Sequence, residues 1–221
     1  MAEQWRRIYA EDPEVFAAFA RAEDPEGRVA AALARHGALS GRRVLEIGAG
    51  TGKLAHRLVP EVASLIALEP EGRLLARMGP GPLRVQAWGQ ALPLKAASVD
   101  CGVAAWVLGY LGRRTVADLL GEVDRVLAPG PGSGIWAIEN GGGGDFQALR
   151  GFKGLEPGAR RLVEDFGFRP VEEIPLRLVF PSAAEAERIL GALCGDAVRA
   201  ALAKAPRAEL SHRAVLLFRP S

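Results

Sequence analysis

Short apolar runs and stretches with helical periodicity follow one another along the chain. The apolar runs predict seven strands, at residues 43–47, 64–68, 83–87, 99–105, 134–139, 168–180 and 210–218. Helical spacing or cap residues predict helices at residues 12–21, 24–37, 53–60, 116–127, 159–166 and 182–203. Strands that alternate with helices in this way are typical of an α/β protein.

Three features predict where particular elements begin and end. Asp24 followed by Pro25 is typical of an N-cap and a first helical residue, and Gly37 would stop that helix. Pro175 is expected to interrupt the strand at 168–180. The stretch 182–203 is expected to form one helix.

Composition sets the class of protein but not its activity. Of the 221 residues 49% are hydrophobic and 24% are charged, which is ordinary for one soluble globular domain. No apolar run is long enough for a membrane span, and the first residues lack the apolar core of a secretory signal, so a cytoplasmic protein is the default. Cys101 and Cys194 fit no metal or redox spacing, and buried thiols are expected.

Charge argues against a nucleic-acid partner. The formal net charge is +2, and the arginines are spread along the chain instead of forming one basic run. Three scattered histidines make a protein-built zinc site improbable, so no metal is expected.

The stretch from Glu46 to Gly52 carries the first chemical signal. A strand runs into three alternating glycines, Gly48, Gly50 and Gly52, and a helix start follows them, so that a ligand can approach bare backbone. The dinucleotide fingerprint G-x-G-x-x-G would need a glycine at Lys53. The observed order, E-x-G-x-G-x-G, resembles motif I of the class I S-adenosylmethionine (SAM) dependent methyltransferases.

The resemblance implies that this glycine turn, including Ala49, lies under the methionine part of SAM. Glu46 would then bind the amino group of SAM directly or through water.

An acidic residue also ends the second predicted strand, at Glu69-Pro70. A carboxylate there can accept hydrogen bonds from both hydroxyls of a ribose, as SAM or NAD would require. Capping of the next helix is the structural alternative for Glu69.

The block from Trp88 to Leu94 resembles the methyltransferase pattern D-A-E-x-L-P-F, whose first residues flank the adenine. Trp88 stands where the pattern has Asp, and Gly89 follows it. An indole cannot accept from the adenine amine, so Trp88 would stack or form a wall, and Gln90 would supply the acceptor.

The segment after the fourth strand, 106–111, resembles the pattern W-V-L-H-H-L of the same family. Ala104 and Ala105 would face the cofactor from the end of the strand. Gly109 and Tyr110 replace the two histidines, so no general base is implied here. Candidate bases are Tyr9, Tyr110, Glu139 and His212, none of them backed by a motif, and the catalytic residue therefore stays unassigned.

The resemblance to class I, type 11 methyltransferases covers about residues 41–140. It implies a Rossmann-like, doubly wound sheet of seven mostly parallel strands with the last strand antiparallel. Residues 1–40 would form a helical lid, with Trp5 and Tyr9 as candidate lid aromatics, residues 41–140 the cofactor core and residues 141–221 the substrate side of a single domain.

The implied function is methyl transfer from SAM to a small molecule, with residues 1–30, 141–160 and 175–205 shaping the acceptor pocket. A protein acceptor, the atom that is methylated and the oligomeric state stay open. The alternatives are an NAD(P)-dependent oxidoreductase, which Glu69 also fits, and a SAM-binding protein without catalysis.

Overall fold

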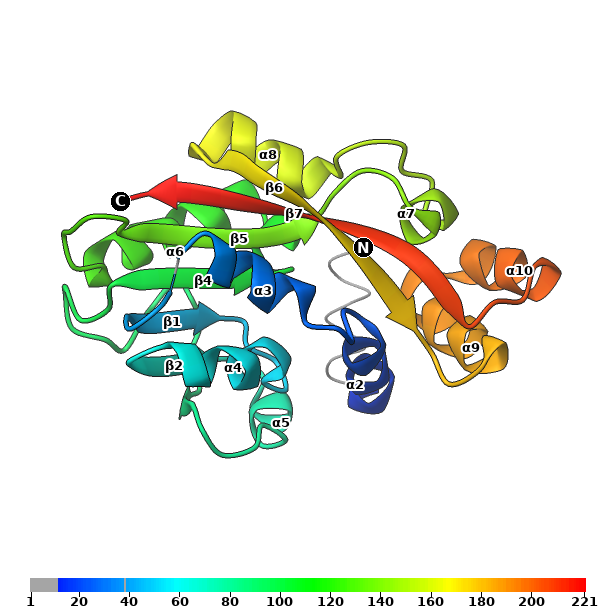
Figure 1. The fold of residues 1–221 in the computed structure, drawn as a ribbon, viewed down its shortest axis with the longest axis horizontal. Helices are drawn as coiled ribbons and strands as arrows, with labels where there is room; N and C mark the ends of the chain where they lie inside the picture. Colours follow the sequence, from blue (N-terminus) through cyan, green and yellow to red (C-terminus); the bar gives the residue numbers. More distant parts are fainter. Residues whose placement is uncertain (1–11, 38) are drawn as a thin grey trace.

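A seven-stranded sheet forms the centre of the computed structural model, which describes residues 12–37 and 39–221 (Figure 1). The strand order is β3-β2-β1-β4-β5-β7-β6. The first five strands are parallel, and β7 is antiparallel to both β5 and β6. The strands are β1 (Arg43–Ile47), β2 (Ser64–Leu68), β3 (Leu83–Val85), β4 (Cys101–Ala105), β5 (Gly134–Asn140), β6 (Arg169–Val179) and β7 (Glu209–Pro220). The predicted α/β sheet with an antiparallel last strand is confirmed.

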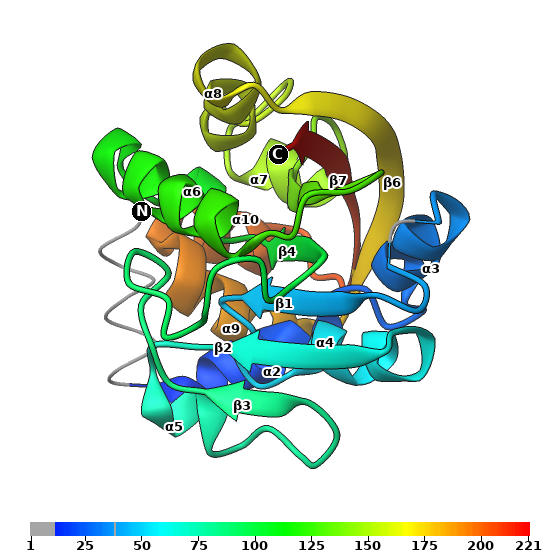
Figure 2. The same cartoon turned by 90° about the vertical axis from the view of Figure 1, so that its left-hand side faces the viewer.

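Helices cover both faces of the sheet (Figure 2). Helices α3 and α4 pack on one face through an apolar cluster that includes Leu33, Leu54 and Leu58. Helices α6 and α8 pack on the other face through Leu119 and Leu162, among others. The helices are α2 (Pro13–Ala22), α3 (Arg28–Arg35), α4 (Lys53–Leu58), α5 (Gly72–Leu75), α6 (Arg113–Val126), α7 (Asp145–Leu149), α8 (Pro157–Phe166), α9 (Ala183–Cys194) and α10 (Asp196–Lys204), with 3₁₀ turns η1 (Val59–Glu61) and η2 (Leu108–Tyr110).

A third apolar cluster lies beyond the carboxyl edge of the parallel strands. Helix α2 packs there against α9, and Phe19, Phe146 and Leu178 are among the buried side chains. This cluster places α2 and α7 next to the ends of β1, β4 and β5, which is the edge where open α/β sheets bind ligands.

The predicted start of the second helix is wrong by three residues. The helix α3 begins at Arg28, after Gly27 at φ 73°. Asp24 is not the N-cap residue, but its carboxylate reaches over the turn and accepts from the backbone N–H groups of Arg28 (2.7 Å) and Val29 (3.1 Å). The carboxylate therefore serves the unpaired N–H groups of the first turn from a position outside the helix.

Two further predictions are wrong because they depend on where the residues lie in the fold. Pro175 does not interrupt β6, where it lies opposite Arg213 of β7, because β6 is the edge strand and a missing N–H there costs no ladder bond. The stretch 182–203 forms two helices, because Gly195 takes φ 96° between α9 and α10.

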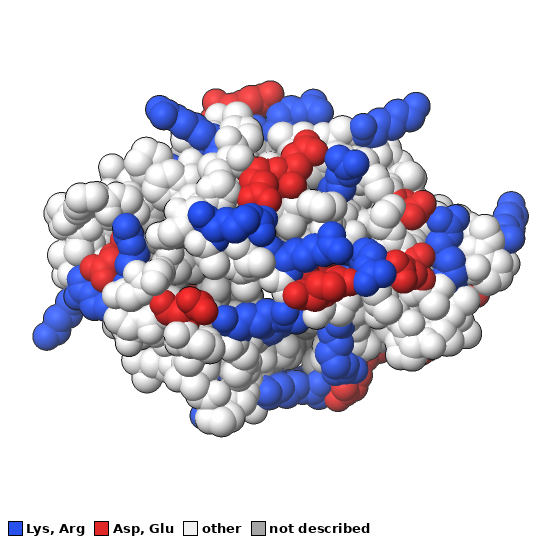
Figure 3. All heavy atoms as spheres, in the orientation of Figure 1, with Lys and Arg blue, Asp and Glu red and all other residues white. Residues whose placement is uncertain are grey.

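Charges of both signs are interspersed on the face shown in Figure 3. Arg177 of β6 pairs with Glu26 and with Glu209, and Arg213 of β7 pairs with Glu173. Within the part of the chain that the structure describes, no helix is long and apolar enough to cross a membrane. Cys101 is buried and Cys194 is half-buried, and both are free thiols.

The N-cap of α9 provides a local test of the fold. The Ser182 hydroxyl accepts from the backbone N–H of Glu185 at 3.1 Å. We expect Ser182→Ala to cost about 1 kcal/mol and to lower the Tm by roughly 2–4 °C, because the first turn loses that acceptor. Ser182→Asp, which keeps a capping oxygen, should melt close to the wild type in the same scan. Equal melting of all three proteins would contradict the capping role.

Candidate active site

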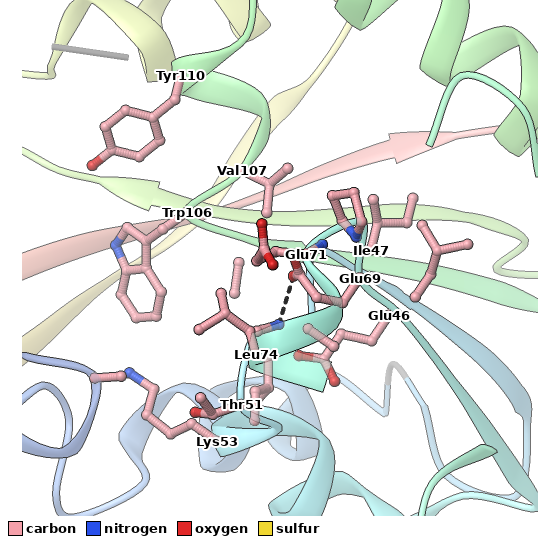
Figure 4. A pocket seen from close by; sticks show the side chains of 18 of the residues that line it. Glu46, Ile47, Thr51, Lys53, Glu69, Glu71, Leu74, Trp106, Val107 and Tyr110 are labelled. Carbon is pink, nitrogen blue, oxygen red and sulfur yellow. Dashed lines mark hydrogen bonds between the residues drawn. The ribbon is translucent and has the colours of Figure 1, made fainter. Parts of the chain in front are cut away.

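A cavity of about 410 Å³ opens at the carboxyl ends of β1, β2, β4 and β5. In the view of Figure 4, Glu46 and Glu69 lie on one side of it, while Lys53, Trp106 and Tyr110 lie on the other. We call these the carboxylate half and the tryptophan half. The carboxylate half is built by the motifs that the sequence singles out, and the tryptophan half is completed by α2 and α7.

The glycine turn after β1 forms the floor of the carboxylate half. Gly48, Ala49 and Gly50 all line the cavity, and both glycines have positive φ, 69° and 57°. A Cβ on Gly48 would lie 2.5 Å from Cγ2 of Val107, so the close approach of the chain after β4 requires a glycine. The turn is fixed by the carbonyl of Leu68, which accepts from the N–H groups of Gly48 (2.8 Å) and Ala49 (3.0 Å).

Glu46 places a buried carboxyl group against this turn. The residue is 2% exposed and lines the cavity, and its Oε2 has no hydrogen-bond partner among the described residues. Burial raises the pKa of Glu46 to about 8, and the nearby Lys53 only partly opposes that shift. A buried acceptor without a partner is costly in a folded protein, so the site is suited to a ligand that donates to it.

Glu69 joins the glycine turn to the turn after β2. Its Oε2 accepts from the N–H of Gly50 and its Oε1 from the N–H of Glu71, both at 2.9 Å. Burial raises the pKa of Glu69, while these two N–H groups act in the opposite direction. Each carboxylate oxygen has a further lone pair, which can accept from a ligand hydroxyl.

Two of the predicted cofactor residues lie outside the cavity lining. Gly52 is buried behind the turn, where a Cβ would meet Met78 and His56, so this glycine serves packing. Ala104 is fully buried in the cluster under α6, and its neighbour Ala105 lines the cavity instead. Successive residues of a strand point to opposite faces, so of the two alanines expected to face the cofactor, Ala105 borders the cavity and Ala104 points away from it.

The remaining cofactor candidates also line the cavity. Pro70, Gly89 and Gln90 are among the lining residues. Trp88 also lines it but is 62% exposed, so its ring forms part of the rim. Gly89 packs closely, because a Cβ there would lie 2.7 Å from Cδ1 of Leu119.

The four candidate bases differ in where they lie relative to the cavity. Tyr110 lines the cavity. Glu139 accepts from the N–H of Gly109 at 2.8 Å and anchors the turn η2, and burial raises its pKa to about 8. His212 is 1% exposed, and burial lowers its pKa to about 3, so its ring is neutral. Neither Glu139 nor His212 is among the residues that line the cavity, and Tyr9, like Trp5, lies outside the described residues.

Three charged cavity residues, Glu23, Lys53 and Glu71, were not predicted. The Lys53 ammonium lies 2.9 Å from Oε2 of Glu23 and 4.8 Å from the ring centre of Trp106. Glu23 ends α2 and is 5% exposed. Lys53 follows the glycine turn directly, which was a usable signal, whereas nothing in the sequence links it to Glu23.

Part of the predicted acceptor region also lines the cavity. Phe16, Phe19 and Phe146 belong to it, from α2 and α7. No residue from 175–205 lines this cavity, and neither do the four consecutive glycines at 141–144.

Comparison with known proteins shows that part of the chain is similar to methyltransferases. Residues 45–132 match the family model described as a methyltransferase domain. An uncharacterised methyltransferase of Mycobacterium tuberculosis is 34% identical over 97 residues, which make up 42% of this chain and 39% of that protein. The match thus spans about two fifths of the length of this curated relative.

Solved methyltransferases share the fold. A putative type II methyltransferase from Anaeromyxobacter dehalogenans aligns with a TM-score of 0.61 at 17% identity, over 86% of this chain and 95% of that one. Phosphoethanolamine N-methyltransferase 1 of Haemonchus contortus, solved with phosphoethanolamine and S-adenosylhomocysteine, aligns with a TM-score of 0.50 at 17% identity, over 63% of this chain and 32% of that one. The resemblance to class I methyltransferases that the sequence indicates is therefore confirmed.

The close approach at Gly48 gives a test of the site. We expect Gly48→Ala to destabilise the protein by about 1–3 kcal/mol, because alanine at φ 69° is strained and its Cβ collides with Val107. Gly121→Ala is the matched control, because Gly121 lies within α6 with no atom near its Cβ position and should gain up to about 1 kcal/mol. Urea unfolding measures both, and a Gly48→Ala protein as stable as the wild type would contradict the geometry.

Proposed function

We propose that the protein transfers a methyl group from SAM to a small-molecule acceptor. The observation that carries this proposal is the unpartnered carboxyl oxygen of Glu46, buried beside the glycine turn. SAM has an ammonium group to fill that position and a ribose diol for Glu69. The family match over residues 45–132 supports the same cofactor.

The described residues fit SAM in both charge and shape. The Glu46 carboxylate would accept from its amino group, and the Glu69 carboxylate would accept from its ribose hydroxyls while still holding Gly50 and Glu71. Gly48, Ala49 and Gly50 line the cavity, so the methionine chain would lie against the backbone of this turn. Gln90 and the rim residue Trp88 would flank the adenine.

When bound, SAM supplies an activated methyl group on a positively charged sulfur. The part of the chain is to hold the acceptor in line with that group and to keep water out, which requires alignment more than acid–base chemistry. Apolar side chains such as Leu74, Leu111 and Leu119 line the cavity and would exclude water. The residue that takes a proton from the acceptor is not assigned.

The enclosing aromatic side chains favour a small acceptor. Phe19 and Phe146 line the cavity, and Phe146, which is 2% exposed, packs against the His212 ring behind Trp106, so this region suits a small molecule better than a folded protein surface. This supports the small-molecule hypothesis over a protein acceptor. Helix α2 would act as one wall of the acceptor site within a single domain.

Titration with S-adenosylhomocysteine, the product of SAM, tests the cofactor class. We expect the wild type to bind it by calorimetry and Glu69→Ala to bind at least about tenfold more weakly, because hydrogen bonds to a charged group are lost. Glu173→Ala is the control, because Glu173 lies on β6 in an exposed ion pair with Arg213. NADH is titrated in parallel, and binding of NADH alone would replace the proposal with the oxidoreductase.

The protonation state of Glu46 gives a second test of the proposed function. With a pKa of about 8 the carboxyl is mostly protonated at pH 7, and a bound ammonium group would favour its ionised form. We therefore expect S-adenosylhomocysteine binding at pH 7 to release a proton, seen as a binding enthalpy that changes with the ionisation enthalpy of the buffer. Glu46→Gln should abolish this release and weaken binding. A wild-type enthalpy independent of buffer would contradict the role of Glu46.

The raised pKa of Glu46 also predicts that the stability of the protein without ligand depends on pH. The pKa of Glu46 is higher in the folded state than its ordinary value of 4.5, so its contribution to stability is fully present below pH 4.5 and is lost as the pH rises to about 8. We expect the Tm of the wild type to fall over this range and the Tm of Glu46→Gln to fall less. The pKa of Glu139 is raised as well, so part of the decrease of Tm with pH should remain in Glu46→Gln. Identical slopes would show that Glu46 ionises normally.

A further inference from the structure

We propose that the tryptophan half of the cavity binds a flat, uncharged aromatic acceptor with an oxygen that accepts a hydrogen bond from the indole N–H of Trp106. This inference rests on the proposed function, because it places the acceptor opposite the SAM site. It narrows the acceptor from any small molecule to one chemical class.

The backbone at Trp106 has an unusual conformation. Its φ is 54°, in the left-handed region that bulky residues rarely adopt. The backbone N–H of Trp106 donates to the carbonyl of Ile138 at 2.7 Å, which holds this conformation at the end of β4. Strain of this kind is concentrated at functional sites, where it aims a side chain.

The indole N–H of Trp106 has no acceptor. The Nε1 atom is buried without a hydrogen-bond partner among residues 12–37 and 39–221, although the side chain lines the cavity. In Figure 4 this nitrogen and the hydroxyl of Tyr110 lie toward the same side of the pocket. An unpartnered donor on a side chain that lines a cavity can be satisfied by a ligand atom that accepts from it.

The charges of this half cancel. Lys53 and Glu23 form an ion pair at 2.9 Å, and the Lys53 ammonium also lies over the Trp106 ring. His212, which lies behind Trp106 with 6.3 Å between ring centres, is neutral. An ionic acceptor would have to break the existing pair, whereas an uncharged acceptor leaves it intact.

Aromatic side chains line the cavity. Phe16, Phe19 and Phe146 line the cavity together with Trp106, and the rings of Phe19 and Phe146 lie 6.0 Å apart at 40°. Aromatic rings stabilise a flat aromatic ligand by stacked or edge-to-face contact.

The buried side-chain amide of Asn140 positions the hydroxyl of Tyr110, which is the second polar group of the tryptophan half. Nε2 of His212 lies 3.1 Å from Oδ1 of Asn140, and Nδ2 of Asn140 donates to the Tyr110 hydroxyl (2.9 Å) and to Glu156 (3.3 Å). With partners on both of its ends, the amide has one favourable orientation, and the neutral ring of His212 then donates from Nε2. Asn140 is thus a positioning residue for the Tyr110 hydroxyl at the edge of the pocket.

Simple aromatic probes test the proposal on the protein saturated with S-adenosylhomocysteine. Ligand-observed NMR titrations use p-cresol, toluene, which lacks the oxygen, and 4-methylbenzoate, which is an anion. We expect p-cresol to bind better than the other two. Trp106→Phe should lower the affinity for p-cresol about tenfold more than the affinity for toluene, because both probes lose contact with the larger indole ring but only p-cresol also loses the N–H donor.

Trp136→Phe is the matched control. Nε1 of Trp136 is likewise buried without a partner among the described residues, but Trp136 belongs to the apolar cluster on the α3 and α4 face and does not line the cavity. This variant should bind p-cresol like the wild type. The wild type alone provides a further test. Its four tryptophans give indole N–H resonances, and one of these should move downfield with p-cresol and not with toluene.

The outcomes separate the two proposals. If S-adenosylhomocysteine does not bind, the proposed function itself is overturned. If it binds but p-cresol binds no better than toluene, or if Trp106→Phe leaves p-cresol binding unchanged, the aromatic-acceptor inference is overturned and the proposed function stands.

Discussion

The site depends on one carboxylate that joins two turns. Glu69 accepts from Gly50 in the turn after β1 and from Glu71 in the turn after β2, and it is 6% exposed while doing so. Parallel pairing of β1 with β2 brings these turns to the same edge of the sheet. The glycines allow the close approach, the carboxylate fixes it, and Glu46 is left beside it with an oxygen that no described residue satisfies.

Much of the fold could be predicted because local signals agree with the tertiary structure. The strands 43–47 and 64–68 were predicted to the residue, since each is a short apolar run that ends at a glycine turn or at Glu69-Pro70. The continuity of β6 through Pro175 could not be predicted, because it depends on β6 lying at the edge of the sheet. The break at Gly195 depends likewise on how α9 and α10 pack.

The two halves of the cavity likewise differ in how far their residues could be predicted from the sequence. In the carboxylate half the chemistry lies within short motifs, so Glu46, Gly48, Gly50 and Glu69 could be named from the sequence. The tryptophan half is assembled from side chains distant in sequence, such as the pair of Lys53 with Glu23. No spacing rule links such residues, and Ala104 shows that even a correct strand can be assigned the wrong face.

The most direct test of the account is the structure of the protein crystallised with S-adenosylhomocysteine. The account predicts the amino group of the ligand within hydrogen-bond distance of Oε2 of Glu46 and the ribose hydroxyls on Glu69, with both carboxylates still in their present positions. A ligand bound elsewhere, or bound in the cavity with Glu46 still without a partner, would contradict it.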